Sequence, residues 1–100
     1  MNIEIKEQNG SYLGILTGWI DTAVASQFLE DMKPLMANAN KSIELDCAKL
    51  EYICSLGLRG VLQLQKESAA KGGSLILTHV EGEVQKILRL TGFDKLLDIR

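Results

Sequence analysis

The chain has few of the side chains that catalytic, metal-binding or disulfide-bonded proteins use. Its 100 residues include one histidine, one tryptophan, one proline and two cysteines. Cys47 and Cys54 are separated by six residues, which is the spacing of neither a redox Cys-x-x-Cys pair nor a zinc ligand pair. With His79 they number three, one fewer than a structural zinc site needs. We therefore predict no metal site and two partly buried thiols in a reducing compartment.

Long apolar runs and concentrated charge are also missing. No apolar run approaches the roughly 20 residues that a transmembrane helix requires, and the start of the chain, residues 1–4, lacks the basic and apolar regions of a signal peptide. The 11 basic and 13 acidic residues are interspersed and leave a net charge of −2. Because nucleic-acid binding needs a concentrated basic face, we expect no nucleic-acid partner. The sequence predicts a cytoplasmic protein without membrane insertion.

Catalysis is not expected, because the sequence offers no convergent set of acid, base and nucleophile. His79 lies between a predicted strand and a predicted helix, which favours a surface or loop role. Ser55 has no histidine near it in the sequence to activate its hydroxyl. The glycines form neither a Gly-x-Gly-x-x-Gly nor a Walker sequence, so no dinucleotide or phosphate site is indicated. We predict a protein that is not an enzyme and has no cofactor.

What the sequence does contain is a regular succession of strand and helix patterns. Since 46% of its side chains are hydrophobic, residues 1–100 are expected to form a single domain with one core. Residues 2–7 alternate apolar and polar side chains, as an edge strand does. Asn9-Gly10 predicts a type I′ turn, because both central residues of that turn need positive φ. A second strand, Tyr12–Thr17, completes the hairpin, and its apolar run indicates that both of its faces are covered.

Two long helical patterns follow the hairpin. The first covers Ala23–Ala37, with Thr22 as its cap and with Pro34 either kinking the helix or separating its last turn. The second covers Ser55–Lys71 and ends at Gly72, which suits the left-handed cap position. Five side chains of the second helix are expected to face the sheet: Leu58, Val61, Leu62, Gln65 and Ala69.

Shorter elements fill the rest of the chain. Ile43–Cys47 and Ser74–Thr78 have strand patterns, Glu81–Thr91 is a third helix, and Leu96–Ile99 is a short closing strand. Strands that alternate with helices pair in parallel through right-handed crossovers. The predicted fold class is therefore α/β, a single domain with a mixed sheet of four or five strands, an N-terminal hairpin and three helices.

Two predicted loops leave the carboxyl ends of neighbouring strands, where open parallel sheets present ligands and partners. They cover residues 18–22 and 49–57. Trp19 either anchors an interface or covers the end of the core, and Asp21 either contacts a partner or caps the following helix. Arg59 and Gln63 lie on the second helix opposite its apolar stripe, so we expect them to be free to contact a partner.

Three motifs occur in order along these elements: Gly18-x-Ile20-Asp21, then Leu45-Asp46 followed by Ile53-x-Ser55-x-Gly57-Leu58, and last Leu88-x-Leu90-Thr91-Gly92-Phe93. Their order and spacing resemble the STAS family, the fold of bacterial anti-sigma factor antagonists, over nearly the whole chain. Asp21, Ser55 and Gly57 match the family pattern. Cys54 stands where the family usually has aspartate, and Leu56 stands where it has the serine that is phosphorylated.

The resemblance implies a role in partner switching. Members of that family bind an anti-sigma factor, often a histidine-kinase-like ATPase, and so free a sigma factor; phosphorylation of the serine breaks the complex. Here Leu56 has no hydroxyl, so we predict constitutive binding. Ser55 either serves as a displaced acceptor or caps its helix. Gly57 would let a partner approach the backbone closely. The partner's identity, the stimulus and the oligomeric state stay open.

Two other functions stay open beside this one. Small stand-alone STAS proteins that resemble this chain are accessory subunits that regulate the ATPase of an ABC lipid transporter. A weak nucleotide-binding or hydrolysing domain is the other alternative, although no phosphate loop is found in the sequence.

Overall fold

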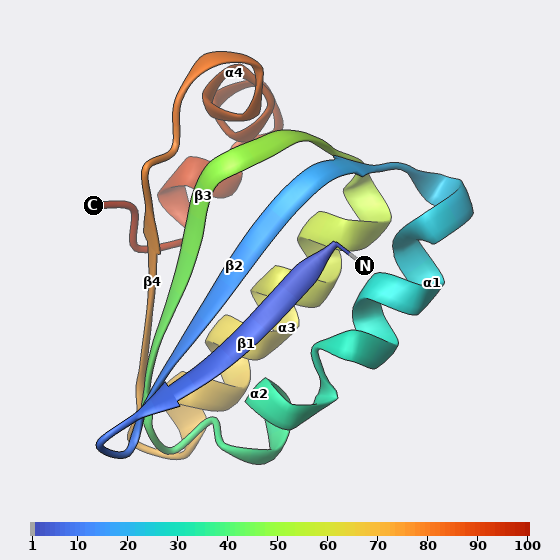
Figure 1. The fold of residues 1–100 in the computed structure, drawn as a ribbon. Helices are drawn as coiled ribbons and strands as arrows, with labels where there is room; N and C mark the ends of the chain where they lie inside the picture. The colour runs from blue at the N-terminus through green and yellow to red at the C-terminus, as the bar shows by residue number, and fades with distance from the viewer. Residues whose placement is uncertain (1) are drawn as a thin grey trace.

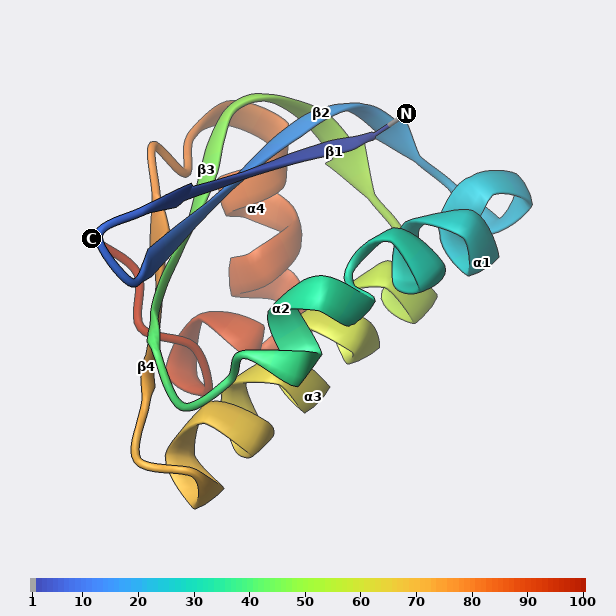
Figure 2. The same cartoon turned by 60° about the horizontal axis from the view of Figure 1, so that its bottom comes forward.

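A computed structural model of the chain describes residues 2–100 as one four-stranded sheet with its helices on one side (Figure 1, Figure 2). In chain order the elements are β1 (Ile3–Gln8), β2 (Ser11–Ile20), α1 (Thr22–Asp31), α2 (Lys33–Ala37), β3 (Ser42–Ile53), α3 (Ser55–Ala70), β4 (Ser74–Thr78), α4 (Gly82–Thr91) and the 3-10 helix η1 (Phe93–Lys95). The strands lie in the order β1-β2-β3-β4, the first pair antiparallel and the others parallel. The predicted mixed sheet with an N-terminal hairpin is confirmed.

The hairpin turn has the backbone that its sequence predicts. Asn9 and Gly10 both have positive φ, 52° and 84°, and Gln8 pairs with Ser11 across the turn. These angles suit a two-residue type I′ turn, whose twist matches that of the flanking strands. The turn therefore sets the register in which Ile3 faces Leu16 at the other end of the hairpin.

One face of the sheet is covered and the other is open. Both parallel crossovers run in the same direction across the sheet, from β2 to β3 and from β3 to β4, so right-handed crossovers put their helices on the same face. Leu13 and Ile15 are only half-buried on the face that no described helix covers, which we call the open face. The prediction that both faces of residues 12–17 are covered is wrong for this reason. Within residues 2–100, no helix combines the length and the apolar character that crossing a bilayer requires.

The first predicted helix is divided in two. α1 ends at Asp31, and Pro34 lies in the first turn of α2, where its missing N–H is not needed. Pro34 therefore separates the last turn, which was one of the two predicted outcomes. Asp21, and not Thr22, is the cap of α1: its carboxylate accepts hydrogen bonds from the N–H groups of Ala23 (3.1 Å) and Val24 (3.3 Å).

Helix α3 faces the sheet with a slightly different stripe from the predicted one. Leu58 and Val61 are buried as expected, and the stripe continues through Leu64 and Ser68. Of the other three predicted residues, Leu62 and Gln65 are half-buried and Ala69 is exposed. Steps of three and four residues from Leu58 lead to Leu64 and Ser68, which moves the contact line away from Leu62 and Ala69.

The C-terminal elements depart from prediction only at the end. The expected left-handed caps are found after α3 and α4, with φ of 78° at Gly72 and 79° at Gly92. In place of the predicted strand Leu96–Ile99, one isolated bridge joins Ile99 to Leu77 of β4. The preceding 3-10 helix, η1, brings the chain back to this edge but leaves too few residues for a ladder.

Candidate partner-binding site

The two predicted segments meet, because the ends of β2 and β3 lie side by side. The N–H of Cys54 donates to the carbonyl of Ile20 at 2.8 Å, and Ile20 pairs with Ile53. The prediction of two loops is wrong in extent, since residues 18–20 and 49–53 belong to strands. A break in the register after Ile15 interrupts the side-chain alternation, and the two strands continue pairing beyond it.

Helices α1 and α3 therefore begin beside each other. The backbone of Cys54 is extended (φ −82°, ψ 171°), and this residue holds the cap position of α3. Ser55 is the first helical residue and is exposed. The expectation that Ser55 caps the helix is wrong, because the cap position lies one residue earlier. Leu56 is 39% exposed, whereas Gly57 is buried.

Gly57 faces the sheet and not a partner. A Cβ at this position would lie 2.9 Å from Ile53 Cγ1 and 3.3 Å from Ile20 Cγ2. The absence of a side chain thus lets the start of α3 pack on the ends of β2 and β3. The predicted role of Gly57, close approach by a partner, is wrong, since the side chains of Ile53 and Ile20 occupy the space beside its Cα.

An apolar groove lies between the two helices, and we call it the α1–α3 groove. Its volume is about 370 Å³, and it is lined by Leu29, Met32, Lys33, Met36, Leu56, Arg59, Gly60 and Gln63. The structure thus brings three predicted site residues together here: Leu56, Arg59 and Gln63. The charged groups of the lining are Lys33 and Arg59, both exposed and both basic.

The width of the groove depends on Gly60. A Cβ on Gly60 would overlap Leu29 Cδ2 and lie 3.6 Å from Met32 Cε. α1 and α3 approach closely at this point, and Leu29 lies over the backbone of α3. Sequence analysis did not single out Leu29 and Met32, because their apolar side chains are part of the helical pattern of residues 23–37. The sequence signal was that the apolar residues of this helix are more than one buried face requires.

Trp19 belongs to a different surface. Its indole is 58% exposed and stacks on Tyr52, with ring centroids 4.8 Å apart and planes at 30°. Because the neighbouring residues Ile20 and Ile53 are buried toward the helices, Trp19 and Tyr52 lie on the open face. Trp19 therefore covers Tyr52 and not the end of the core, and it is separated from the α1–α3 groove by the sheet.

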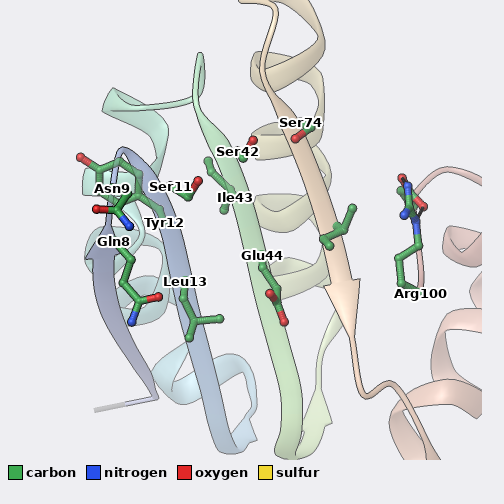
Figure 3. A pocket seen from close by; sticks show the side chains of 12 residues that line it. Gln8, Asn9, Ser11, Tyr12, Leu13, Ser42, Ile43, Glu44, Ser74 and Arg100 are labelled. Atoms are coloured by element: carbon green, nitrogen blue, oxygen red, sulfur yellow. Dashed lines mark hydrogen bonds and ion pairs between the residues drawn. The ribbon is translucent and has the colours of Figure 1, made fainter.

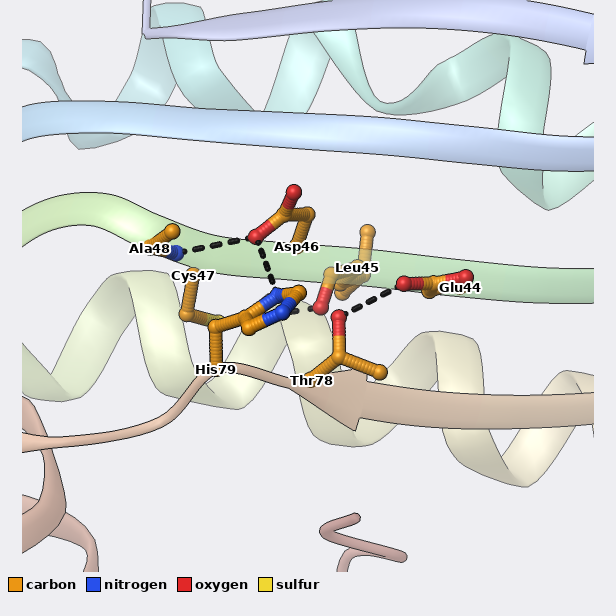
Figure 4. Close-up of polar contacts among 7 residues, drawn as sticks. All are labelled: Glu44, Leu45, Asp46, Cys47, Ala48, Thr78 and His79. Carbon is orange, nitrogen blue, oxygen red and sulfur yellow. Dashed lines mark hydrogen bonds and ion pairs between the residues drawn. The ribbon is translucent and has the colours of Figure 1, made fainter.

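The open face also carries a polar cluster around β3 and β4 (Figure 4). Thr78 Oγ1 donates to Glu44 Oε2 at 2.7 Å, while Asp46 Oδ1 accepts from the N–H of Ala48 and lies 3.0 Å from His79 Nδ1. These groups satisfy one another, and residues 2–100 hold no cluster of three metal-ligating side chains. His79 follows β4 with φ 58°, in the loop position predicted for it.

Both thiols are free and buried, as predicted. The Cys47 side chain points from β3 toward the helices, on the side opposite Asp46 (Figure 4). Burial, and secondarily the negative charge of Asp46, raises the pKa of Cys47 to about 12. The neutral thiol is the form that this site stabilises, which makes Cys47 a packing residue and not a nucleophile.

Another hollow lies at the opposite end of the sheet, near the starts of β2, β3 and β4 (Figure 3). It has a volume of about 640 Å³, and its lining includes Tyr12, Leu13, Glu44, Ile76 and Arg100. The lining includes none of the predicted site residues. Arg100 is engaged in a bidentate ion pair with Asp98, at 2.8 and 2.9 Å, which raises the pKa of Arg100 and lowers that of Asp98.

Comparison with known proteins agrees with this architecture. The chain matches the family model described as "Mlab, STAS domain" over residues 15–98. BtrV of Bordetella bronchiseptica, a candidate anti-sigma factor antagonist, is 27% identical over 93 residues, which are 93% of this chain and 80% of BtrV.

Solved structures of anti-sigma factor antagonists share the fold. One from Mycobacterium paratuberculosis has a TM-score of 0.83 at 18% identity, over 97% of this chain and 82% of its own. Unphosphorylated SpoIIAA of Bacillus has a TM-score of 0.77 at 17% identity, over 98% of this chain and 87% of its own. Since the family model covers most of the sequence and the fold agrees, the chain belongs to the STAS domain family.

Proposed function

We propose that the protein is an anti-sigma factor antagonist, a non-catalytic binding module of a partner-switching system that regulates transcription. Membership of the STAS family and the antagonists among its relatives support this role. The observation that carries the proposal is the open α1–α3 groove, because it is lined by Leu56, which the sequence resemblance assigns to the position of the phosphoacceptor serine.

The proposed partner is an anti-sigma factor of the histidine-kinase-like ATPase type, bound over the α1–α3 groove. Burial of the exposed part of Leu56 would contribute a fraction of the ~1.5–3 kcal/mol of a fully transferred leucine. Arg59 and Gln63, on the same lining, supply polar contacts. Asp21 is proposed as a flanking contact, although it already caps α1, whereas Trp19 stacks on Tyr52 across the sheet and lies outside this surface.

Binding is proposed to be constitutive. A phosphoserine would bring about −1.5 to −2 charges into the interface, and Leu56 cannot carry one. Control would then come from the abundance of the protein or from the partner. Ser55 is exposed and does not act as the helix cap, so its hydroxyl is the one to test as a displaced acceptor.

Capture of the partner from the native host tests the proposed function, with mass spectrometry to identify what is retained. The expected result is a kinase-like anti-sigma protein bound by the unaltered chain. Arg59→Glu should lower that affinity by about fivefold or more, since an ion pair of ~1 kcal/mol at most becomes a repulsion. Lys86→Glu on α4, equally a charge reversal at an exposed site, is the control. Retention of a transporter ATPase would favour the lipid-transport alternative and overturn the proposal.

Intact-mass spectrometry tests whether the protein escapes phosphorylation, as constitutive binding requires. The protein and Leu56→Ser are each incubated with the captured partner and ATP. We expect phosphate on the variant alone. A phosphate on the unaltered protein that maps to Ser55 would contradict constitutive binding.

A further inference from the structure

Strand β1 is an open edge of the sheet. The N–H of Thr17 donates to the carbonyl of Asn2 at 2.9 Å, and the register places Ile3 opposite Leu16. Hydrogen-bonded pairs alternate along an antiparallel ladder, so the bonded residues of β1 are the even-numbered ones. The backbone N–H and C=O groups of Ile3, Ile5 and Glu7 therefore point away from β2, toward the edge.

A second groove of about 470 Å³ runs beside this edge, and we call it the β1-edge groove. It is lined by Ile3, Glu4, Ile5, Glu30, Asp31 and Pro34. Its apolar surface comes from two isoleucines and a proline, and every charged group in the lining is acidic.

The acidic charge of this groove is only partly compensated. Glu30 forms an ion pair with Lys33 at 2.6 Å. Asp31 accepts a hydrogen bond from the neutral amide of Gln27 at 2.8 Å, and within residues 2–100 no ion pair neutralises it. The site thus offers unpaired backbone groups, an apolar surface and residual negative charge along one line.

We propose that the β1-edge groove binds an extended segment of another protein in which basic residues alternate with β-branched apolar ones. The segment adds to the sheet as a fifth strand and forms backbone hydrogen bonds with Ile5 and Glu7, whereas Ile3 is buried. Main-chain pairing of this kind provides affinity, while alternate side chains provide specificity. Alternate side chains of a strand point to opposite faces, so the basic side chains of the segment point toward the helices, where Glu30 and Asp31 lie, and the apolar ones lie on the open face. The aliphatic stems of the basic side chains cover Ile5 and Pro34. The inference does not depend on the proposed function.

A second copy of the chain fits this edge less well. Antiparallel self-pairing centred on Ile5 would place Glu7 of the second copy opposite Ile3, beside the acidic residues Glu30 and Asp31. The same register would pair Lys6 with Glu4 on the exposed open face, where an ion pair contributes little to binding. The charge of the groove therefore favours a basic segment over self-association.

Residue-specific amide exchange, measured by NMR, tests the proposal. The probe is a synthetic peptide of alternating valine and arginine, and the control peptide alternates valine and glutamate. In the free protein the amides of Ile5 and Glu7 should exchange fast, and the basic peptide should slow each by about tenfold or more. The amides of Glu4 and Lys6, already bonded to β2, serve as internal references.

Matched charge reversals test whether the acidic residues carry the interaction. Asp31→Lys should weaken binding of the valine–arginine peptide by about tenfold, while Glu83→Lys on α4, the same change at an exposed site elsewhere, should leave it within about twofold. Equal losses in both variants would mean that the net charge of the protein, and not Asp31, causes the effect, and would overturn the proposal. Unprotected edge amides, equal protection by the acidic peptide, or protection that grows with protein concentration alone would also overturn it.

Discussion

The α1–α3 groove and the β1-edge groove lie on two sides of the same helical junction, yet their chemistry is opposite. Leu29, Met32 and Lys33 contribute to the first, whose charged residues are basic, and Glu30 and Asp31 contribute to the second, whose charged residues are acidic. Positions three and four apart share a helix face, whereas adjacent positions do not. A stretch of five residues can therefore serve two surfaces that differ in the partners they accept.

The two surfaces also differ in what a partner would contact. In the α1–α3 groove the backbone is bonded within helices, so a partner meets side chains such as Leu56 and Arg59. At the β1 edge the backbone itself is available. Substitutions should therefore abolish binding in the first groove more readily than in the second.

Truncation of a core residue of α3 should have the largest effect on stability. Leu64 is fully buried in α3, so Leu64→Ala is expected to lower the free energy of unfolding by about 2–5 kcal/mol. Leu62, half-buried on the same helix, should lose clearly less on truncation to alanine. Urea denaturation of both variants measures the difference. An equal or larger loss for Leu62→Ala would mean that the buried face of α3 is assigned incorrectly.

A charge introduced into the α1–α3 groove should weaken binding there and leave binding at the β1-edge groove unchanged. Leu56→Asp is expected to weaken binding of the anti-sigma partner by up to about 1.5–3 kcal/mol, the contribution of a buried leucine, and to leave the valine–arginine peptide unaffected. Leu90→Asp is the matched control, because Leu90 is 80% exposed on α4. Titration calorimetry with each ligand measures both effects. Loss of peptide binding in Leu56→Asp would show that the grooves are coupled.

Removal of the α1 cap should weaken the wall that both grooves share. Asp21→Ala is expected to lower the free energy of unfolding by about 0.5–2 kcal/mol, because the N–H groups of Ala23 and Val24 lose their acceptor. If Asp21 only contacted a partner, the other role that the sequence left open, Asp21→Ala would leave the free energy of unfolding unchanged. Asp21→Ser, which keeps a capping oxygen, should recover most of the loss in thermal denaturation. No recovery would contradict the capping role.

At neutral pH the smallest effect, none, is expected at Cys47, in the sheet beneath the helices. Its pKa is raised from 9.0 to about 12 in the folded state, so above pH 9 the unfolded chain releases a proton that the folded chain keeps. Unfolding is then favoured as pH rises, and stability should fall between pH 9 and about 12. Cys47→Ala should show a shallower decline in denaturant titrations. Identical slopes would contradict the pKa shift.

Features encoded by adjacent residues could be predicted from the sequence. The turn at Asn9-Gly10, the helix ends at Gly72 and Gly92, and the separating effect of Pro34 each depend on the backbone preferences of one or two residues. The extent of β3 could not be predicted, because a break in its pairing with β2 near Lys49 interrupts the alternation on which strand assignment relies.

The candidate site was predicted in part for a related reason. Arg59 and Gln63 were found because they lie opposite the apolar stripe of one helix, and Leu56 was found through the resemblance to the STAS family. Leu29 and Met32 were missed, since whether an apolar residue lines a groove or the core depends on how far apart two helices lie. The β1-edge groove joins Ile3–Ile5 to Glu30–Pro34, and only the folded chain brings these together.

The contact between Gly60 and Leu29 has a consequence for how such a module diversifies. Any side chain at position 60 would overlap the Cδ2 methyl of Leu29, so Leu29 would have to change rotamer or α1 would have to move. Since Leu29 lines the groove, a change at position 60 would reshape its wall, while changes at Arg59 or Gln63 would adjust single contacts. Within a lineage, position 60 would therefore act as the coarse control of partner choice and its neighbours as the fine one.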